Sequence, residues 1–380
     1  MLSALKDFSK RKGKIVKKLL CGLVVLFLLA MSIIAGCGND HNDSATAPVR
    51  KYAYVTNWGN NTVSQYTIGA DGSLIPMTPS TVATSSAPTS VTVDPLGKYV
   101  YVANLYGDSV SQYRVTTNGH LTSMTPATVS TGVEPYSVTV APSGKYVYVA
   151  NKGSNVVSQY TIGLDDNLIA MTPPGVATGD SPYSVTVAPS GKYAYVTNGA
   201  SGNISQYTIG ADGSLTPMTP STVAAGNGPV TVTVSPSGEY AYVTNCYDKN
   251  ISQYTIGADG SLTPITPATV PTGNFPHTVT VAPSGKYAYV TNNGENTVSQ
   301  YTIGVDGSLT AMAPASVATG GNPISVTVDP TGKYVYVANG NGNSNNVSQY
   351  TIGADGRLTS LTPATVAAGA NPVSVITIAK

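Results

Sequence analysis

Apolar and polar residues alternate with a period of two through almost the whole chain after residue 50. Residues 137–140 and 146–149 each place a valine at every second position, and Val, Thr, Tyr and Ile dominate such stretches. Branched and aromatic side chains in this alternation favour half-buried strands. No segment after residue 36 has the three-to-four-residue apolar spacing of an amphipathic helix. The pattern predicts an all-β protein.

A unit of 47 residues is repeated seven times. The motif Lys-Tyr-Ala-Tyr-Val-Thr-Asn begins at residue 51 and recurs with small changes at 98, 145, 192, 239, 286 and 333. Each unit predicts four strands, illustrated by residues 137–140, 146–149, 157–162 and 215–223, with Asp-Gly hairpin turns before the fourth. Prolines such as Pro217 and Pro220 place this fourth strand on a sheet edge, because proline cannot donate a ladder hydrogen bond.

The phase of the repeat predicts how the two ends of the chain meet. Four antiparallel strands in 40–50 residues are typical of a β-propeller blade. The first unit begins on a second strand, and the chain ends with residues 374–378, a first strand without partners. We therefore predict a seven-bladed β-propeller over residues 51–380, in which the C-terminal strand pairs into blade one and closes the ring.

Charge is divided unevenly along the chain. Residues 1–36 carry a net charge of +6 and the remainder −5, so the body has no electrostatic reason to bind nucleic acid. The basic head is followed by an apolar run from Leu19 to Ala35. This order predicts an export signal over residues 1–36, although an uncleaved membrane anchor is the alternative.

The end of the apolar run resembles the lipobox of bacterial lipoproteins. The matching residues are Ile34, Ala35, Gly36 and Cys37. The resemblance implies cleavage before Cys37, lipid attachment to its thiol, and a polar tether over residues 37–50. Gly38 replaces the aspartate that retains such proteins in the inner membrane. We thus expect an exported monomer held in the cell envelope by its lipid alone, more readily at the outer membrane.

The repeated Tyr-Val-Thr-Asn segment carries a second resemblance. It occurs at Tyr54–Asn57, Tyr195–Asn198, Tyr242–Asn245 and Tyr289–Asn292, and the other copies have Tyr-Val-Ala-Asn. With the preceding Pro-Ser-Gly-Lys turns, the body resembles the YVTN-repeat, lactonase-superfamily propellers. The resemblance implies a seven-bladed fold and, for activity, either 6-phosphogluconolactonase-like hydrolysis or a surface protein without catalysis.

The strand order assigns the connections to two faces. Pro-Ser-Gly-Lys and Ala-Asp-Gly-Ser turns form a nearly invariant turn face, where lysines are expected to stand against aspartates. Asparagine-rich and Thr-Gly-x-x-Pro loops form a variable face. The residue after each loop proline is expected to overhang the central channel there. These residues are Thr89, Tyr136, Tyr183, Val230, His277, Ile324 and Val373.

Candidate chemistry gathers on the variable face in blades five and six. Cys246 and His277, with Glu295 in the next loop, could form a nucleophile–base pair or a soft metal site. Drift between duplicated loops is the alternative explanation, and no metal site is expected. Ligand contacts are predicted from the aromatic and polar residues of this face, namely Tyr106, Tyr136, Tyr183, Tyr247 and His277.

Two functions remain open after several exclusions. Three histidines exclude a multi-histidine metal centre, and one tryptophan excludes the repeated tryptophans of quinone-binding propellers. The sequence has no phosphate loop, serine triad or zinc motif, so no cofactor is expected. The first hypothesis is an envelope scaffold that recognises a protein or glycan through its variable face. The alternative is a lactonase acting at the channel mouth.

Overall fold

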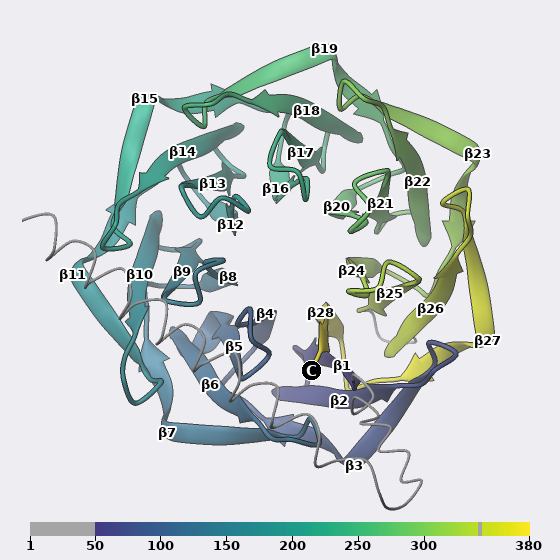
Figure 1. Cartoon of the computed structure of the whole chain (residues 1–380), viewed down its shortest axis with the longest axis horizontal. Coiled ribbons are helices and arrows are strands. Elements are labelled where there is room, and N and C mark those ends of the chain that lie inside the picture. Colours follow the sequence, from purple (N-terminus) through teal and green to yellow (C-terminus); the bar gives the residue numbers. More distant parts are fainter. Residues whose placement is uncertain (1–49, 341–343) are drawn as a thin grey trace, which may run out of the picture. The chain divides into compact units, whose positions relative to one another are not determined.

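Seven four-stranded antiparallel sheets form a closed ring (Figure 1). The computed structural model describes residues 50–340 and 344–380, so the predicted signal, Cys37 and most of the tether lie outside the described residues. In the described part the one helical element is a short 3-10 turn, η1 (Leu105–Gly107). No helix of that part has the length and apolar character needed to cross a membrane.

Each blade places one strand at the channel and three further strands outward. The channel strands are β28 (Pro372–Ala379), β4 (Pro88–Val93), β8 (Pro135–Val140), β12 (Pro182–Val187), β16 (Pro229–Val234), β20 (Pro276–Val281) and β24 (Pro323–Val328). The second strands are β1 (Lys51–Asn57), β5 (Tyr99–Asn104), β9 (Tyr146–Asn151), β13 (Tyr193–Asn198), β17 (Tyr240–Asn245), β21 (Tyr287–Asn292) and β25 (Tyr334–Asn339).

The outer half of each blade is equally regular. The third strands are β2 (Thr62–Ile68), β6 (Ser109–Val115), β10 (Val156–Ile162), β14 (Asn203–Ile209), β18 (Asn250–Ile256), β22 (Thr297–Ile303) and β26 (Asn346–Ile352). The edge strands are β3 (Leu74–Ala83), β7 (Leu121–Ser130), β11 (Leu168–Ala177), β15 (Leu215–Ala224), β19 (Leu262–Pro271), β23 (Leu309–Ala318) and β27 (Leu358–Ala367). The proline-rich strand is at the edge, as predicted.

The predicted closure of the ring is confirmed. Strand β28 pairs antiparallel with β1, with Tyr54 opposite Ile376, and the two strands complete blade one. Lys51 adds an ion pair of 3.2 Å to Asp329 of blade seven. Burial alone would raise the pKa of Asp329, but hydrogen bonds from Thr331, the Tyr334 and Lys333 amides and Lys51 hold it below its usual value.

The hydrophobic core lies between neighbouring blades, and a glutamine hydrogen bond crosses each of these interfaces. One core cluster combines Tyr54 and Val63 of blade one with Val102 of blade two. The Gln65 side chain donates to the Pro79 carbonyl and accepts from the Leu121 amide at 2.6 Å in the next blade. An equivalent glutamine joins every blade to the next. Repetition therefore fixes the blades rigidly around the channel.

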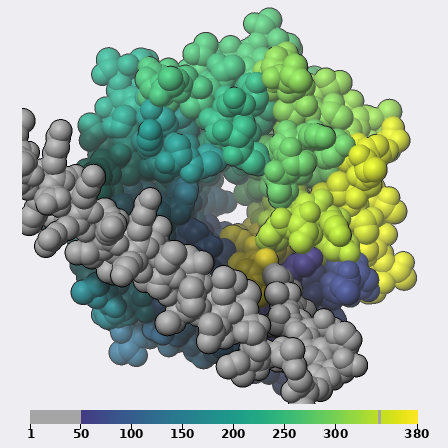
Figure 2. All heavy atoms as spheres, viewed as in Figure 1, coloured from purple at the N-terminus to yellow at the C-terminus, as the bar shows by residue number. Residues whose placement is uncertain are grey.

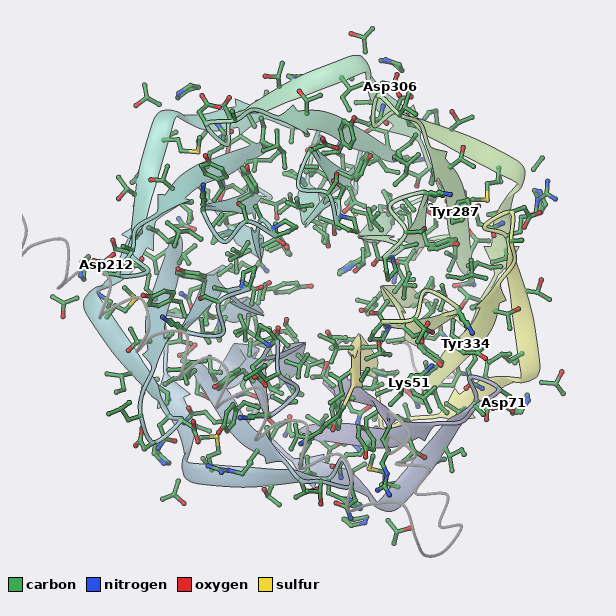
Figure 3. All side chains as sticks on the ribbon, in the orientation of Figure 1. Lys51, Asp71, Asp212, Tyr287, Asp306 and Tyr334 are labelled. Carbon is green, nitrogen blue, oxygen red and sulfur yellow. The ribbon has the colours of Figure 1, made fainter. Side chains whose placement is uncertain are left out.

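On the turn face the lysine–aspartate pairing expected in every repeat is mostly absent from the described residues, where Lys51–Asp329 is the one such ion pair. The Asp71 carboxylate instead accepts hydrogen bonds from the Ser73 amide (3.0 Å) and hydroxyl (2.7 Å). The same arrangement holds for Asp212 and Asp306, which lie at the periphery of the ring in Figure 3. These three carboxylates are satisfied by the serine of their own turn and need no cation.

One interface departs from the repeat. In six blades the hairpin between the third strand and the edge strand contains a glycine with φ of 79–84°. The carbonyl of this glycine accepts a hydrogen bond from the hydroxyl of a buried tyrosine in the preceding blade. In blade three Asp166 stands at this position with φ 69°. The matching hydroxyl, on Tyr101, is buried without a hydrogen-bond partner. We attribute the loss of this hydrogen bond between blades two and three to the Asp166 side chain, which stands where the other blades have glycine.

Candidate functional site

A repeated backbone device positions the residues around the channel mouth. The residue before each loop proline has a positive φ, and its carbonyl accepts from the first residue of the adjoining loop of the same blade. In blade six this residue is Phe275 (φ 51°), which accepts from the Asn293 amide at 3.0 Å. Pro276 then begins β20, and His277 follows at the channel wall. The lining residue is therefore fixed by backbone geometry in every blade.

The asparagine that ends each second strand holds the loops beneath the mouth. Asn104 is fully buried; its amide group donates to the Ser111 hydroxyl at 3.0 Å, and its oxygen accepts from the Thr84 hydroxyl at 2.8 Å. Thr84 belongs to the connection between blades one and two. The repeated asparagine thus holds both loops of the variable face in place. Its recurrence in the sequence motif reflects this structural role and no catalytic one.

Two adjoining cavities occupy the mouth on the variable face. The larger has a volume of about 370 Å³ and the smaller about 170 Å³, and Tyr136 and His277 line both. Together they are lined by all seven residues that follow the loop prolines. Figure 2 shows that the ring is open along its axis. The geometry therefore places the predicted overhanging residues around two cavities that share Tyr136 and His277 as lining residues.

Tyrosines of the mouth differ from those of the blades in their hydrogen bonding. Most of the 25 tyrosines donate to backbone carbonyls, as Tyr54 does to Gly119 at 2.7 Å. In the described residues the hydroxyls of Tyr136, Tyr183, Tyr106 and Tyr247 make no hydrogen bond to protein. These four are the tyrosines that the sequence predicts as ligand contacts. Their donors remain available to a bound molecule.

Tyr136 and Tyr183 form an aromatic pair on one wall of the larger cavity. Their rings meet edge to face, with centroids 4.8 Å apart and an interplanar angle of 73°. The Lys152 ammonium lies 5.2 Å from the centroid of the Tyr183 ring. A Cβ atom at Gly199 would lie 2.6 Å from that ring, so glycine is what lets the ring rest there. Burial, with Tyr183 and Cys246 nearby, raises the pKa of Tyr136 to about 12.

His277 presents a neutral imidazole to both cavities. Burial of the side chain within the propeller lowers the pKa of His277 to about 4, despite a hydrogen bond to the Ile324 backbone that favours the charged form. Its Nδ1 lies 3.4 Å from the hydroxyl of Thr278, which itself donates to the Ile324 carbonyl at 2.7 Å. Because that hydroxyl proton is already committed to the Ile324 carbonyl, we assign the imidazole proton to Nδ1, which leaves Nε2 as the free base.

The predicted cluster of Cys246, His277 and Glu295 is only partly assembled. Cys246 and His277 line the larger cavity together, whereas Glu295 is exposed and lines neither cavity. No hydrogen bond joins the thiol to the imidazole in the described part of the chain. Burial raises the pKa of the Cys246 thiol, which disfavours the thiolate. No group of three metal-binding side chains occurs among the described residues.

Sequence reasoning named Cys246 but missed that it belongs to a second set of lining positions. In four blades the first residue of the loop after the second strand lines the cavities, and these residues are Trp58, Leu105, Gly199 and Cys246. Tyr106 lies farther out, 64% exposed, with its ring 6.1 Å from that of Trp58. Tyr247 is 65% exposed at the edge of the larger cavity. Comparing the seven loops at this position would have revealed the set.

A larger hollow of about 580 Å³ lies on the turn face between blades one and two. It is lined by Lys51, Tyr52 and His120, among others. Lys51 is already paired with Asp329, and the Tyr52 hydroxyl donates to the Thr117 carbonyl. We take the channel mouth as the candidate site because all seven residues that follow the loop prolines meet there.

The model of a family described as lactonase, seven-bladed β-propeller, matches residues 35–180 and 165–376. The chain belongs to this lactonase family. No curated protein sequence matches this chain. Many solved structures are similar to it.

Several of the similar structures are named for lactone chemistry, and two of them illustrate the likeness. A putative 6-phosphogluconolactonase from Bacteroides fragilis has a TM-score of 0.76 and 21% identity, with 88% of this chain and all of that chain covered. The periplasmic gluconolactonase PpgL of Pseudomonas aeruginosa has a TM-score of 0.70 and 20% identity, with 87% and 99% covered. At such identities these likenesses establish the fold.

Proposed function

We propose that this lactonase-family propeller hydrolyses a lactone at the channel mouth on its variable face. The observation that carries the proposal is the convergence, in one hollow, of a neutral imidazole with free tyrosine hydroxyls. Ester hydrolysis needs a base for the attacking water and a donor for the developing oxyanion. His277 meets the first need and Tyr136 the second. Family membership supports this reading above that of a binding scaffold.

The chemical steps follow from these two groups. A water oxygen bonds to the lactone carbonyl carbon while its proton passes to Nε2 of His277. The carbonyl oxygen takes up negative charge and accepts a hydrogen bond from the Tyr136 hydroxyl, whose high pKa keeps it protonated. The bond between the carbonyl carbon and the ring oxygen then breaks, and the imidazolium returns its proton to that oxygen. The product is an open-chain hydroxy acid.

Export and lipid anchoring through Cys37 form part of the proposal. Strand β1 begins at Lys51 on the turn face, where the Arg50 amide donates to the Lys380 carbonyl at 2.9 Å. The chain therefore enters the ring on the face opposite the mouth. We propose accordingly that the lactone substrate is met outside the cytoplasm.

The test compares two histidine variants of residues 38–380 on a panel of lactones. Replacing His277→Gln removes the base and is expected to lower kcat/KM by about 100-fold or more. His120→Gln, on the turn face, is the matched control and should retain full activity. Equal activity of the wild type and the His277 variant would exclude the proposed base. Absence of turnover on the whole panel would remove the proposal.

A binding scaffold remains the second candidate because the rim of the variable face exposes aromatic rings. Tyr106 and Tyr247 are about two-thirds exposed, and Phe275 is 46% exposed. Exposed aromatic side chains are typical anchors for protein or glycan partners. A glycan-array signal that disappears in Tyr247→Ser would support this function. An array without binding, alongside lactone turnover, would exclude it for glycans.

A further inference from the structure

We propose that the substrate of this site is a lactone bearing an uncharged aliphatic substituent of about five carbons. The inference rests on the proposed function and specifies its substrate class. It follows from the different linings of the two joined cavities. Tyr136 and His277 stand where the cavities meet, so a lactone ring held there would project any substituent into one of them.

The smaller cavity is built to receive an apolar group. Its walls include Trp58, Leu105, Ile324 and Val373. Thr89 also lines it, but its hydroxyl donates to the Pro135 carbonyl at 3.2 Å and is not free for a ligand. Apart from the shared His277 and Tyr136, the described lining therefore offers a bound group hydrocarbon and ring surface. Removing apolar area from water here favours an aliphatic chain.

The larger cavity is suited to the lactone ring and its water. It holds the free hydroxyls of Tyr136, Tyr183 and Tyr247 beside His277. Among the described residues, neither cavity is lined by a lysine, arginine, aspartate or glutamate. The Lys152 ammonium lies against the Tyr183 ring and does not line the cavity. A phosphate or carboxylate substituent would lose its hydration here without gaining an ion pair.

The volume of the smaller cavity limits the length of the chain. A volume of about 170 Å³ holds about five groups of the ~30 Å³ size of a water molecule. Each methylene moved into it should improve affinity about 3- to 4-fold, the factor that follows from ~0.8 kcal/mol per buried CH₂. Longer chains should bring no further gain because their additional carbons remain in water.

The chain contains one tryptophan, and it lies in the wall of this cavity. The fluorescence of Trp58 therefore reports occupancy directly, whether or not the ligand is hydrolysed. The experiment titrates residues 38–380 with γ-lactones that carry alkyl groups of one to eight carbons, and with glucono-1,5-lactone as the polar reference. Turnover of the same compounds is measured in parallel.

We expect ligand binding to shift the Trp58 emission to the blue. The affinity obtained from this titration should rise with chain length and level off near five carbons, and kcat/KM should follow the same course. Val373→Phe narrows the cavity and should abolish this dependence on length. Leu164→Ser, a fully exposed position on the turn face, is the control and should preserve it.

The outcomes separate this inference from the proposed function. Turnover that does not vary with chain length, without a Trp58 shift, would overturn the inference and leave lactone hydrolysis standing. Stronger turnover of glucono-1,5-lactone than of any alkyl lactone would also overturn it. A length-dependent Trp58 shift without any turnover would support aliphatic binding in the smaller cavity and reject hydrolysis.

Discussion

His277 should make the stability of the ring depend on pH in a defined window. Its pKa is about 4 in the folded protein against about 6.5 in an unfolded chain. Between these values the unfolded state binds a proton that the folded state excludes, so acid favours unfolding. A difference of about 2.5 pKa units corresponds to about 3 kcal/mol. The wild type should lose this stability progressively as the pH falls from 6.5 to 4.

The assay is equilibrium unfolding in guanidinium across this pH range, with His277→Gln as the reference. Acidic groups common to both proteins contribute equally, so the difference between their unfolding free energies isolates the imidazole. We expect the wild type to become less stable relative to the variant by up to about 3 kcal/mol at pH 4. His120→Gln should follow the wild type. Parallel curves for the wild type and His277→Gln would refute the desolvated imidazole and, with it, the assignment of a neutral base.

Three further changes test other parts of the molecule. Asp166→Gly should raise the free energy of unfolding by about 1–2 kcal/mol because it restores the hydrogen bond from the Tyr101 hydroxyl to the backbone carbonyl of residue 166. Tyr101→Phe in the same protein should cancel that gain. A lower free energy of unfolding for Asp166→Gly would contradict this explanation. Gly199→Ala should displace the Tyr183 ring and lower kcat/KM by about 10-fold without changing the circular dichroism, whereas unchanged kinetics would detach that ring from the site. Cys37→Ser should abolish lipidation, seen by mass spectrometry as loss of the diacylglyceryl mass from the protein of the expressing host, and equal masses would refute the lipobox.

The fold was predictable because every unit repeats the same short-range pattern. Alternating residues assign the strands, proline assigns the edge, and the unpaired final strand requires closure. The ring of residues after the loop prolines, including Tyr136 and His277, follows from strand order alone. Because each blade packs only against its neighbours, predicting the four strands of one repeat was enough to predict the whole ring.

Side-chain contacts within the loops could not be predicted in this way. Glu295 and His277 occupy neighbouring connections in sequence terms, yet only the histidine reaches the mouth. The lysines and aspartates of the turn face suggest pairing, but in most turns a serine of the same turn satisfies the carboxylate first. The missing hydrogen bond of Tyr101 arises from one side chain, Asp166, in place of glycine. Such outcomes depend on distances of a few ångströms that strand patterns do not contain.

The most direct test of a catalytic channel mouth is a crystal structure of residues 38–380 with an alkyl-substituted γ-lactam, which resembles the lactone but resists hydrolysis. We predict that the lactam ring lies between Tyr136 and His277, with its carbonyl oxygen within hydrogen-bond distance of the Tyr136 hydroxyl and its alkyl group against Trp58. Density for the lactam in the hollow beside Lys51 and His120, with an empty mouth, would contradict the account.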